Sequence, residues 1–389
     1  MNDNEKLNHN AFNEIWKIHP ELQNNVSSAW WFFLLFPDQQ EGYGPKQLMF
    51  AFASKAGKNI GVRNIWQKGM NIKNLKKGNA KTKFMTTLVG WIFDGEKVHE
   101  GVIHQEMEAE LSNKGYLIAK NNQNEKNFIA NLKGDIKDHF EVNAEFVNEN
   151  TNIKFSANSM NDPNILNPQL TEIKPKVVNK LFNVNVVTWK KFDFKGIFET
   201  LNFKGNLSGV GYFQRVLFNG PLIPWTWVWI VFENGNVLST FIPFFGFQNF
   251  RRKDKFYSIK NENRRVKINP TSYFIIEGKY KREIRFNEID IKLNYSNKNL
   301  NEELPGLQLK LSNNENEWLE VGIISNGHAQ FHLERGYLKN IIKSKWCYNE
   351  YMIKVNSFSG VLNKIEMSEL KNEMGNGWGN MEYTHGMSI

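Results

Sequence analysis

Along most of the chain, hydrophobic and polar residues alternate with a period of two, the repeat of a β-strand with two unlike faces. Gly, Asn and Asp separate the runs, and these residues favour turns. Hairpin turns are expected at Phe93-Asp94-Gly95-Glu96 and at Asn113-Lys114-Gly115. The pattern predicts strands over 30–36, 47–54, 83–93, 97–111, 116–120, 128–132, 140–146 and 153–159.

The segment 205–245 carries the strongest single pattern. Trp225, Trp227 and Trp229 recur at every second residue, so an extended strand places all three indoles on one face. The residues between them are also hydrophobic, and Glu233-Asn234-Gly235-Asn236 then predicts a tight turn into a strand at 237–241. A strand hydrophobic on both faces belongs inside a closed or sandwiched sheet, where its aromatic face can line an apolar cavity.

Few segments have a helical pattern. Residues 8–26 predict a short helical lead-in with Phe12, Ile15 and Trp16 on one side. The three prolines within 161–180 predict a loop or crossover, in which 177–182 could form a short helix. Many short strands with regular turns and few helices predict an all-β sandwich or barrel.

The two halves of the chain resemble each other. A tryptophan-rich strand opens each half, at 29–33 and at 225–229, and a Gly-x-Gly strand closes each, at 209–215 and 377–383. This order predicts two tandem antiparallel β-barrels of unequal length. The expected organisation is a lead-in at 1–26, a first barrel at 27–216 and a second barrel at 217–389.

These landmarks resemble a lipocalin-like, double-calycin superfamily that includes carotenoid 1,2-hydratase (hydroxyneurosporene synthase) and tocopherol cyclase. The residues that carry the resemblance are Trp30-Trp31, 209–215, 225–235 and 377–384, which touch both halves. In that family the mid-chain strand continues into an acidic residue and a histidine. Here Phe213, Gln214 and Arg215 hold neither, so the resemblance implies the fold more than the reaction.

The family's reactions imply an acid that protonates an alkene, with aromatic faces that stabilise the carbocation. An apolar site can keep a carboxylic acid protonated near neutral pH by raising its pKa. Glu382, within a predicted strand, and Glu233, at a turn, are the catalytic candidates, ahead of Asp94 and Glu106. Glu233 has the alternative interpretation of a solvated hairpin residue.

The ligand-binding candidates are aromatic residues and one amide. Tyr212 and Gln214 share a strand face and could bind a hydroxyl or carbonyl at the end of an apolar ligand, if that face points inward. The alternative for the tryptophans is that they fill a core. The full set is Trp225, Trp227, Trp229, Tyr212, Gln214, Trp31, Trp378 and Tyr383.

No cofactor or metal is expected. His99, His104, Glu106, Glu108 and Glu110 invite a metal-site hypothesis, but their alternation with hydrophobic residues is typical of a strand with one wet face. Sequence motifs for zinc, phosphate loops and nucleophile elbows are absent from the 389 residues. His328 and His332 are expected on one strand face.

Charge and cysteine content restrict the possible binding partners and the cellular compartment of the protein. The net charge of +9 is spread, with its densest patches at 73–83 and 251–267, which read as loops rather than a nucleic-acid surface. The single cysteine, Cys347, fits a reducing compartment and buried packing. With no signal-peptide pattern and no long apolar run, the sequence predicts a cytoplasmic protein, with peripheral membrane contact as an alternative.

These patterns predict a protein that binds a hydrophobic, isoprenoid or lipid-like small molecule in an aromatic-lined barrel. The alternative is an acid-catalysed hydratase, cyclase or isomerase that acts on the same ligand. A third hypothesis is a structural protein with solidly filled barrels that binds partners through its basic loops. No nucleic-acid partner is expected.

Overall fold

The computed structural model describes most of the chain, with gaps at its ends and in several connections. The described residues are 10–17, 27–39, 44–55, 60–62, 65–67, 81–121, 129–136, 140–148, 150–158, 168–173, 183–219, 224–245, 266–267, 269–277, 282–295, 304–337, 342–362, 365–366 and 374–385. The chain divides into two compact units, one formed by 1–95 with 99–221 and the other by 96–98 with 222–389.

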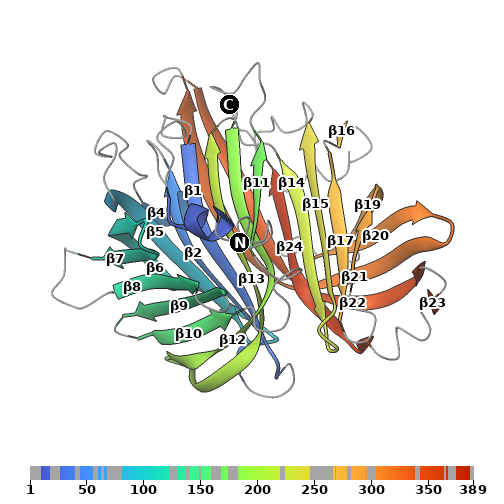
Figure 1. Cartoon of the computed structure of the whole chain (residues 1–389), viewed down its shortest axis with the longest axis horizontal. Helices are drawn as coiled ribbons and strands as arrows, with labels where there is room; N and C mark the ends of the chain where they lie inside the picture. The colour runs from blue at the N-terminus through green and yellow to red at the C-terminus, as the bar shows by residue number, and fades with distance from the viewer. Residues whose placement is uncertain are drawn as a thin grey trace. The chain divides into compact units, whose positions relative to one another are not determined.

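The first unit is an antiparallel barrel of eleven strands (Figure 1). Their spatial order is β10-β9-β8-β7-β6-β5-β2-β1-β13-β12-β11. The strands are β1 (Ser27–Pro37), β2 (Gln47–Lys55), β5 (Lys81–Phe93), β6 (Val98–Ser112), β7 (Tyr116–Lys120), β8 (Ile129–Ile136), β9 (Phe140–Val147), β10 (Asn152–Asn158), β11 (Gln169–Ile173), β12 (Asn183–Thr200) and β13 (Phe203–Asn219). Two short strands, β3 (Ile60–Val62) and β4 (Ile65–Gln67), pair with each other.

Strand β12 closes the first barrel. Its first part pairs with β11, and its second part pairs with β10 at the other end of the sheet. Its register against β13 shifts between Trp189 and Phe192, which is a β-bulge. Because a bulge bends the strand that carries it, this shift lets one strand serve both edges.

The second unit is built around nine strands in the order β18-β17-β15-β14-β24-β22-β21-β20-β19. Its two end strands, β18 and β19, are consecutive in sequence and separated only by Asn287, so the chain itself joins the two edges. The strands are β14 (Trp225–Phe232), β15 (Val237–Phe245), β17 (Thr271–Ile276), β18 (Arg282–Phe286), β19 (Glu288–Tyr295), β20 (Pro305–Asn314), β21 (Glu317–Tyr337), β22 (Ile342–Leu362) and β24 (Gly377–His385); β16 (Val266–Lys267) pairs with β15, and β23 (Ile365–Glu366) with β22.

The predicted fold class, two antiparallel barrels in an all-β chain, is confirmed. Every strand predicted in the first half is present, with small differences at its ends. Gly95, Gly115 and Gly235 occupy the predicted turns with φ values of +106°, +88° and +84°, which favour glycine. The loop predicted at 161–180 is wrong in part because it contains β11, and the helix considered at 177–182 lies outside the described residues.

Of the helical lead-in predicted at 8–26, residues 10–15 form a short helix that belongs to the first unit. Trp16 and Lys17 are not helical, and 8–9 and 18–26 lie outside the described residues. Phe12, Ile15 and Trp16 are buried in the core of the first barrel. The helix is held at its C-terminal end because Trp31 Nε1 donates a hydrogen bond of 2.8 Å to the carbonyl oxygen of Ile15. A carbonyl left over at a helix end thus finds a partner inside the barrel.

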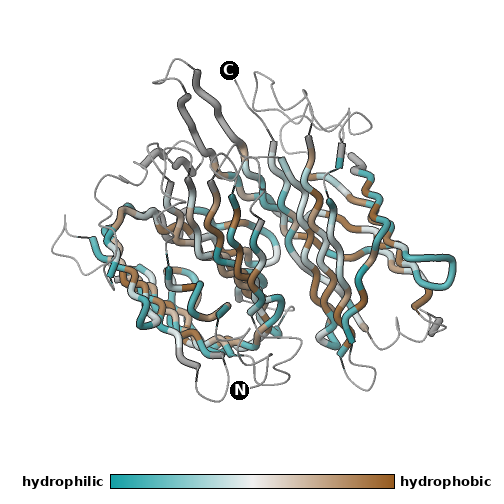
Figure 2. Tube along the Cα trace, turned by 45° about the horizontal axis from the view of Figure 1, so that its top comes forward, coloured by the Kyte–Doolittle hydropathy of each residue, from teal (hydrophilic) through white to brown (hydrophobic). Residues whose placement is uncertain are grey.

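Each barrel has its own hydrophobic core, and the alternation of brown and paler residues along the strands is visible in Figure 2. In the second barrel the core contains Val228, Ile230 and Phe232 of β14, together with residues from the other principal strands. Trp227 and Trp229 are buried on the opposite face of β14. The prediction that the tryptophan row faces the barrel interior is therefore wrong, because the aliphatic face fills that role.

Candidate functional site

Glu382 lies near the end of β24, on the same face as the tryptophan row of β14. The register places it directly opposite Trp227 on one side and Glu350 of β22 on the other. Only 7% of Glu382 and 1% of Glu350 is exposed. Two carboxyl side chains are thus buried as neighbours across one strand pair, where facing residues have Cβ atoms about 5 Å apart.

Burial changes the acidity of Glu382. Loss of water raises its pKa from 4.5 to about 7, while side-chain hydrogen bonds from Tyr348 and Trp225 oppose this rise by stabilising the carboxylate. The indole Nε1 of Trp225 donates a hydrogen bond of 2.9 Å to Glu382 Oε2. Near neutral pH this carboxyl group can therefore both hold and release a proton.

Aromatic rings surround this acid on the same face of the sheet. The ring of Trp225 lies 5.7 Å from Tyr348 and 6.4 Å from Phe241, and Phe331 lies 6.1 Å from Tyr348. Phe241 is 39% exposed, and Trp225 and Tyr348 are half-buried. We call Trp225, Trp227, Phe241, Phe331 and Tyr348 the aromatic wall. It reaches from buried Glu382 to the surface at Phe241.

The aromatic wall and Glu382 together provide the groups that acid catalysis on an apolar molecule requires. A protonated carboxyl group can donate its proton to an apolar molecule lying on the rings. The ring faces would then attract a positive charge that develops on that molecule, by about 0.5–2 kcal/mol for each ring. A second carboxyl group, at Glu350 of β22, faces Glu382 across the strand pair.

The other candidates of the second barrel divide between the two faces. Trp229 and Trp378 lie on the face of the aromatic wall, further along the strands, opposite Asn380 and Val231 respectively. Tyr383 lies on the inner face and is part of the barrel core. Glu233 is an exposed turn residue that accepts a hydrogen bond of 2.8 Å from Asn376 Nδ2. It is six residues along the chain from Trp227, or about 20 Å in an extended strand.

The candidates in the first barrel divide between the two faces of its sheet. Trp31 is fully buried in the core of the first barrel and stacks on Phe84 at 6.0 Å. Phe213 and Arg215, rather than Tyr212 and Gln214, share the inner face of β13 with core residues. Tyr212 packs edge-on against Phe32 on the opposite face, at 6.4 Å. The inward placement considered for Tyr212 and Gln214 is thus not the one found.

A polar cluster lies on the inner face of β21 and β22, behind the aromatic wall. Asn349 is fully buried, and its Nδ2 donates to the carbonyl oxygen of Tyr383 at 3.1 Å. That bond fixes the amide orientation, so Oδ1 accepts from His328 Nε2 and Gln330 Nε2, each at 2.9 Å. Because Oδ1 can only accept, His328 carries a proton on Nε2. Cys347 is buried beside Asn349, as predicted.

The sequence interpretation missed Phe241 of β15, Phe331 of β21 and two further members of the site, Tyr348 and Glu350. Both lie on β22, where the run from Cys347 to Tyr351 alternates and places Tyr348 and Glu350 on one face. This alternation was a usable signal for the shared face. The pairing of β22 with β24, which brings that face to Glu382, joins residues too far apart in sequence to be read from local patterns.

The acidic row on β6 has partners of its own. Glu110 and Glu108 face Lys81 and Lys83 of β5, with nitrogen–oxygen distances of 3.0 and 3.6 Å. His99 is bonded to Asp94 across the β5–β6 turn. In the described part of the chain, no three such side chains form a group that could hold a metal ion. The side chain of His104 lies outside the described residues.

No protein-family model matches this chain, and no curated protein matches it. Solved structures with a similar barrel fold include a protein assigned as AttH from Nitrosomonas europaea (12% identity, covering 92% of this chain and 93% of that one, TM-score 0.45). Two others are CghA with Sch210972 (8%, 93% and 89%, TM-score 0.49) and kievitone hydratase from Nectria haematococca (12%, 96% and 94%, TM-score 0.43). Similarity at this level concerns the fold and identifies no ligand or reaction.

The described residues contain no helix with the length and hydrophobicity that a membrane span requires.

Proposed function

We propose that this protein binds a hydrophobic small molecule, of isoprenoid or other polyene-like lipid character, on the aromatic wall of its second barrel. The observation that carries the proposal is the set of rings that leads from exposed Phe241 to the buried carboxyl group of Glu382. Rings offer a flat apolar molecule a large contact area, and burying it stabilises the complex by about 25 cal/mol for each Å² of apolar surface.

A polar group at the end of such a ligand also finds partners on the wall. Tyr348 and Trp225 already bond to Glu382, and a protonated Glu382 can donate a hydrogen bond to a hydroxyl or carbonyl oxygen. A few convergent polar groups in an apolar lining are typical of small-molecule sites. The site thus suits a mostly apolar molecule with at most one small uncharged polar group.

Binding can be tested with all-trans-retinol as an uncharged polyene probe, using energy transfer from the protein's tryptophans to the bound probe. Phe241→Ala should weaken binding at least fivefold by removing the exposed end of the wall. Ile324→Ala is a matched control, because Ile324 is 41% exposed against 39% for Phe241 and lies on the same barrel. Equal affinities for the two variants, or no binding by the native protein, would contradict the proposal.

A second candidate function is acid catalysis on the same ligand, favoured by the raised pKa of Glu382. The carboxyl O–H bond would break as a C–H bond forms on an alkene carbon, leaving a carbocation against the wall and a carboxylate at Glu382. Water or a second alkene of the ligand would then add to the cation. Loss of a proton from the adduct to the Glu382 carboxylate would restore the acid.

The catalytic hypothesis has its own test. Glu382→Gln keeps the shape of the side chain and removes the transferable proton, so turnover of an isoprenoid alkene panel should fall at least 100-fold. Retinol affinity in this variant should change less than threefold. Turnover unchanged by this substitution would remove the catalytic role and leave the binding function in place.

A further inference from the structure

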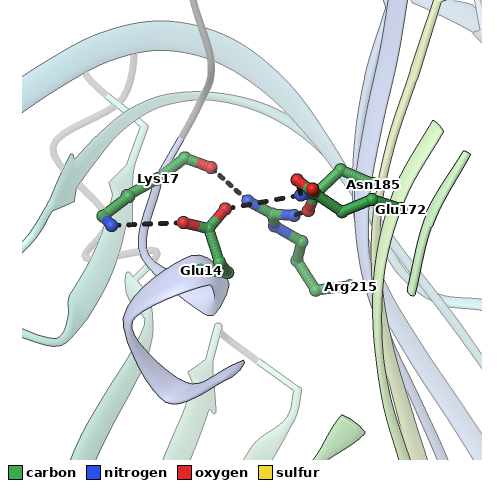
Figure 3. Close-up of polar contacts among 5 residues, drawn as sticks. All are labelled: Glu14, Lys17, Glu172, Asn185 and Arg215. Atoms are coloured by element: carbon green, nitrogen blue, oxygen red, sulfur yellow. Dashed lines mark hydrogen bonds and ion pairs between the residues drawn. The ribbon is translucent and has the colours of Figure 1, made fainter. Parts of the chain in front are cut away.

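Each barrel buries an ionisable side chain, and the one in the first barrel has oxygen acceptors and a structural role. Arg215 Nη1 donates to Oδ1 of Asn185, and Nη2 donates to the backbone carbonyl of Lys17 at 2.6 Å (Figure 3). Burial lowers the pKa of Arg215 to about 9 while the charge of Glu14 opposes this, so the side chain is cationic at neutral pH. These bonds join β13 to the residues that follow the helix over 10–15.

Glu382 of the second barrel receives its hydrogen bonds from uncharged groups. The indole Nε1 of Trp225 donates to it at 2.9 Å, and the hydroxyl group of Tyr348 is the other donor. Among the described residues, no lysine, arginine or histidine forms an ion pair with Glu382. When Glu382 ionises, it is therefore a buried negative charge without a countercharge, and such a charge is costly.

The row of residues that crosses the sheet at Glu382 contains rings and carboxyl groups. In register from β15 to β21, this row is Phe241, Trp227, Glu382, Glu350 and Ala329. The two immediate neighbours of Glu382 are thus an indole and a second carboxyl group, and neither supplies a positive charge. An opposite charge placed nearby favours the ionised form of a carboxyl group.

The adjoining positions on this face of β14, β24 and β22 are also uncharged. They are Trp225, Trp229, Tyr348, Met352, Asn380 and Thr384. The next charged residue along β22 is Lys354, four residues from Glu350, or about 13 Å in an extended strand. Its side chain is exposed, so water and salt screen its charge. The positive charge that would stabilise ionised Glu382 is therefore not supplied by these neighbours.

The rings near Glu382 are steeply inclined to one another. The planes of Trp225 and Tyr348 meet at 73°, and those of Tyr348 and Phe331 meet at 68°. Inclined rings can contact a compact group from more than one side. Ring faces attract cations, and several rings around one ammonium group form the aromatic cage that binds such ligands. The rings and the ionised carboxyl group thus favour the same kind of ligand group.

We propose that the aromatic wall binds a second class of ligand, a lipophilic ammonium cation, when Glu382 is ionised. The ammonium group lies against the rings of Trp225 and Tyr348 beside the carboxylate, and the apolar chain follows the wall toward exposed Phe241. The uncharged ligand of the proposed function suits protonated Glu382, and the cation suits its ionised form. Both ligands use one wall, so this inference rests on the proposed function. Where Glu382 is protonated, binding of the cation releases that proton to the solvent.

The direct experiment compares farnesylamine with farnesol, two ligands of equal chain length that differ in the charged group. A primary amine stays protonated between pH 6 and pH 8, as a lysine side chain does. A carboxyl group with a pKa of about 7 is about tenfold more ionised at pH 8 than at pH 6, so native protein should bind the amine about tenfold more tightly at pH 8. The affinity for farnesol should not rise.

Proton release gives a second readout on the native protein. Calorimetric titration at pH 6, in two buffers of different ionisation enthalpy, should show release of about one proton with farnesylamine and none with farnesol. Glu382→Gln should remove both the release and the pH dependence. Glu288→Gln is the matched control, because Glu288 is an exposed carboxylate of the same barrel, and it should leave both unchanged.

Competition with retinol separates failure of this inference from failure of the proposed function. At pH 8, excess farnesylamine should displace retinol and abolish the energy transfer. Retinol binding together with an amine affinity that does not change with pH, or a pH dependence that persists in folded Glu382→Gln, would overturn the cation site and leave the proposed function in place. No binding of retinol, farnesol or farnesylamine would overturn both. The measurements on native protein remain decisive if the variant does not fold.

Discussion

The two barrels bury ionisable groups of opposite sign on opposite faces of their sheets. In the first, Arg215 lies on the inner face, beneath the helix over 10–15. In the second, Glu382 and Glu350 lie on the face opposite the barrel core, within or beside the aromatic wall. The buried arginine thus lies on the inner face of one barrel, and the buried acids lie on the outer face of the other.

The two barrels lower the free-energy cost of burying an ionisable group in two different ways. Arginine stays cationic when its pKa falls to about 9, so the first barrel supplies oxygen acceptors from Asn185 and Lys17. A carboxyl group can instead become neutral by keeping its proton, as Glu382 does when burial raises its pKa to about 7. The first solution depends on fixed hydrogen bonds, and the second produces a proton donor.

The largest expected effect concerns the helix that distinguishes the first barrel. Trp31→Ala should lower the free energy of unfolding by about 3–5 kcal/mol, because it opens a cavity and leaves the Ile15 carbonyl without its donor. Trp225→Ala should cost clearly less, since Trp225 is half-buried. Urea unfolding of both variants measures the difference. Equal losses would show that the helix contributes little to the first barrel.

The next effect is a pH dependence that belongs to the second barrel. Glu382 has a folded pKa of about 7 against 4.5 when unfolded, so the folded state binds the extra proton between these values. The contribution of Glu382 to stability is therefore greatest below about pH 4.5, falls as the pH rises to 7 and is then level, a loss of roughly 3 kcal/mol. Glu382→Gln should abolish this loss and be the more stable protein at pH 8. Parallel unfolding curves of the two proteins at pH 5 and pH 8 would contradict the assignment.

The buried side-chain amides of Asn185 in the first barrel and Asn349 in the second allow a more direct comparison of the two barrels. Asn185→Ala removes an acceptor from a buried cation and should cost about 2–3 kcal/mol, since hydrogen bonds to charged groups are the stronger ones. Asn349→Ala leaves a buried carbonyl at Tyr383 without its donor and should cost about 1–2 kcal/mol. Chemical denaturation of both variants at pH 7 measures the pair. The reverse order would mean that the charge of Arg215 is compensated by groups other than Asn185.

The smallest effect tests the wall around the acid. Trp225→Phe keeps an aromatic ring and removes the indole donor to Glu382, so stability should fall by only about 1 kcal/mol. The pKa of Glu382 should rise further, because a bond that stabilises the carboxylate is lost. A titration followed by carbon NMR of labelled glutamate measures the shift. A lower pKa in this variant would show that the indole does not donate to Glu382.

Local patterns predicted the strands and most of the turns because each depends on residues close in sequence. The helix over 10–15 and the β14 strand formed as their periodicities indicated. The two faces of β14 are both hydrophobic, so the pattern could not say which of them turns toward the core; the structure assigns it to Val228, Ile230 and Phe232.

The candidate site could be predicted only in part from the sequence, because local patterns do not show which faces meet. Glu382 was identified as an acid in a strand, and the structure adds that it is buried among rings. The surroundings of Glu350 and Arg215 depend on pairings between strands that are distant in sequence. Strand β22 pairs with β24, and β13 pairs with both β1 and β12. The register between strands that are distant in sequence cannot be recognised in a short sequence pattern.

We infer that Glu382 holds a proton near neutral pH, within the aromatic wall that we propose as the binding surface for an apolar ligand. A carbon NMR titration of glutamate-labelled protein, with Glu382→Gln to identify the resonance, measures this directly. We expect a midpoint near pH 7 that moves higher when retinol is bound, because the ligand excludes more water. A midpoint near 4.5, or one that retinol leaves unchanged at saturation, would contradict it.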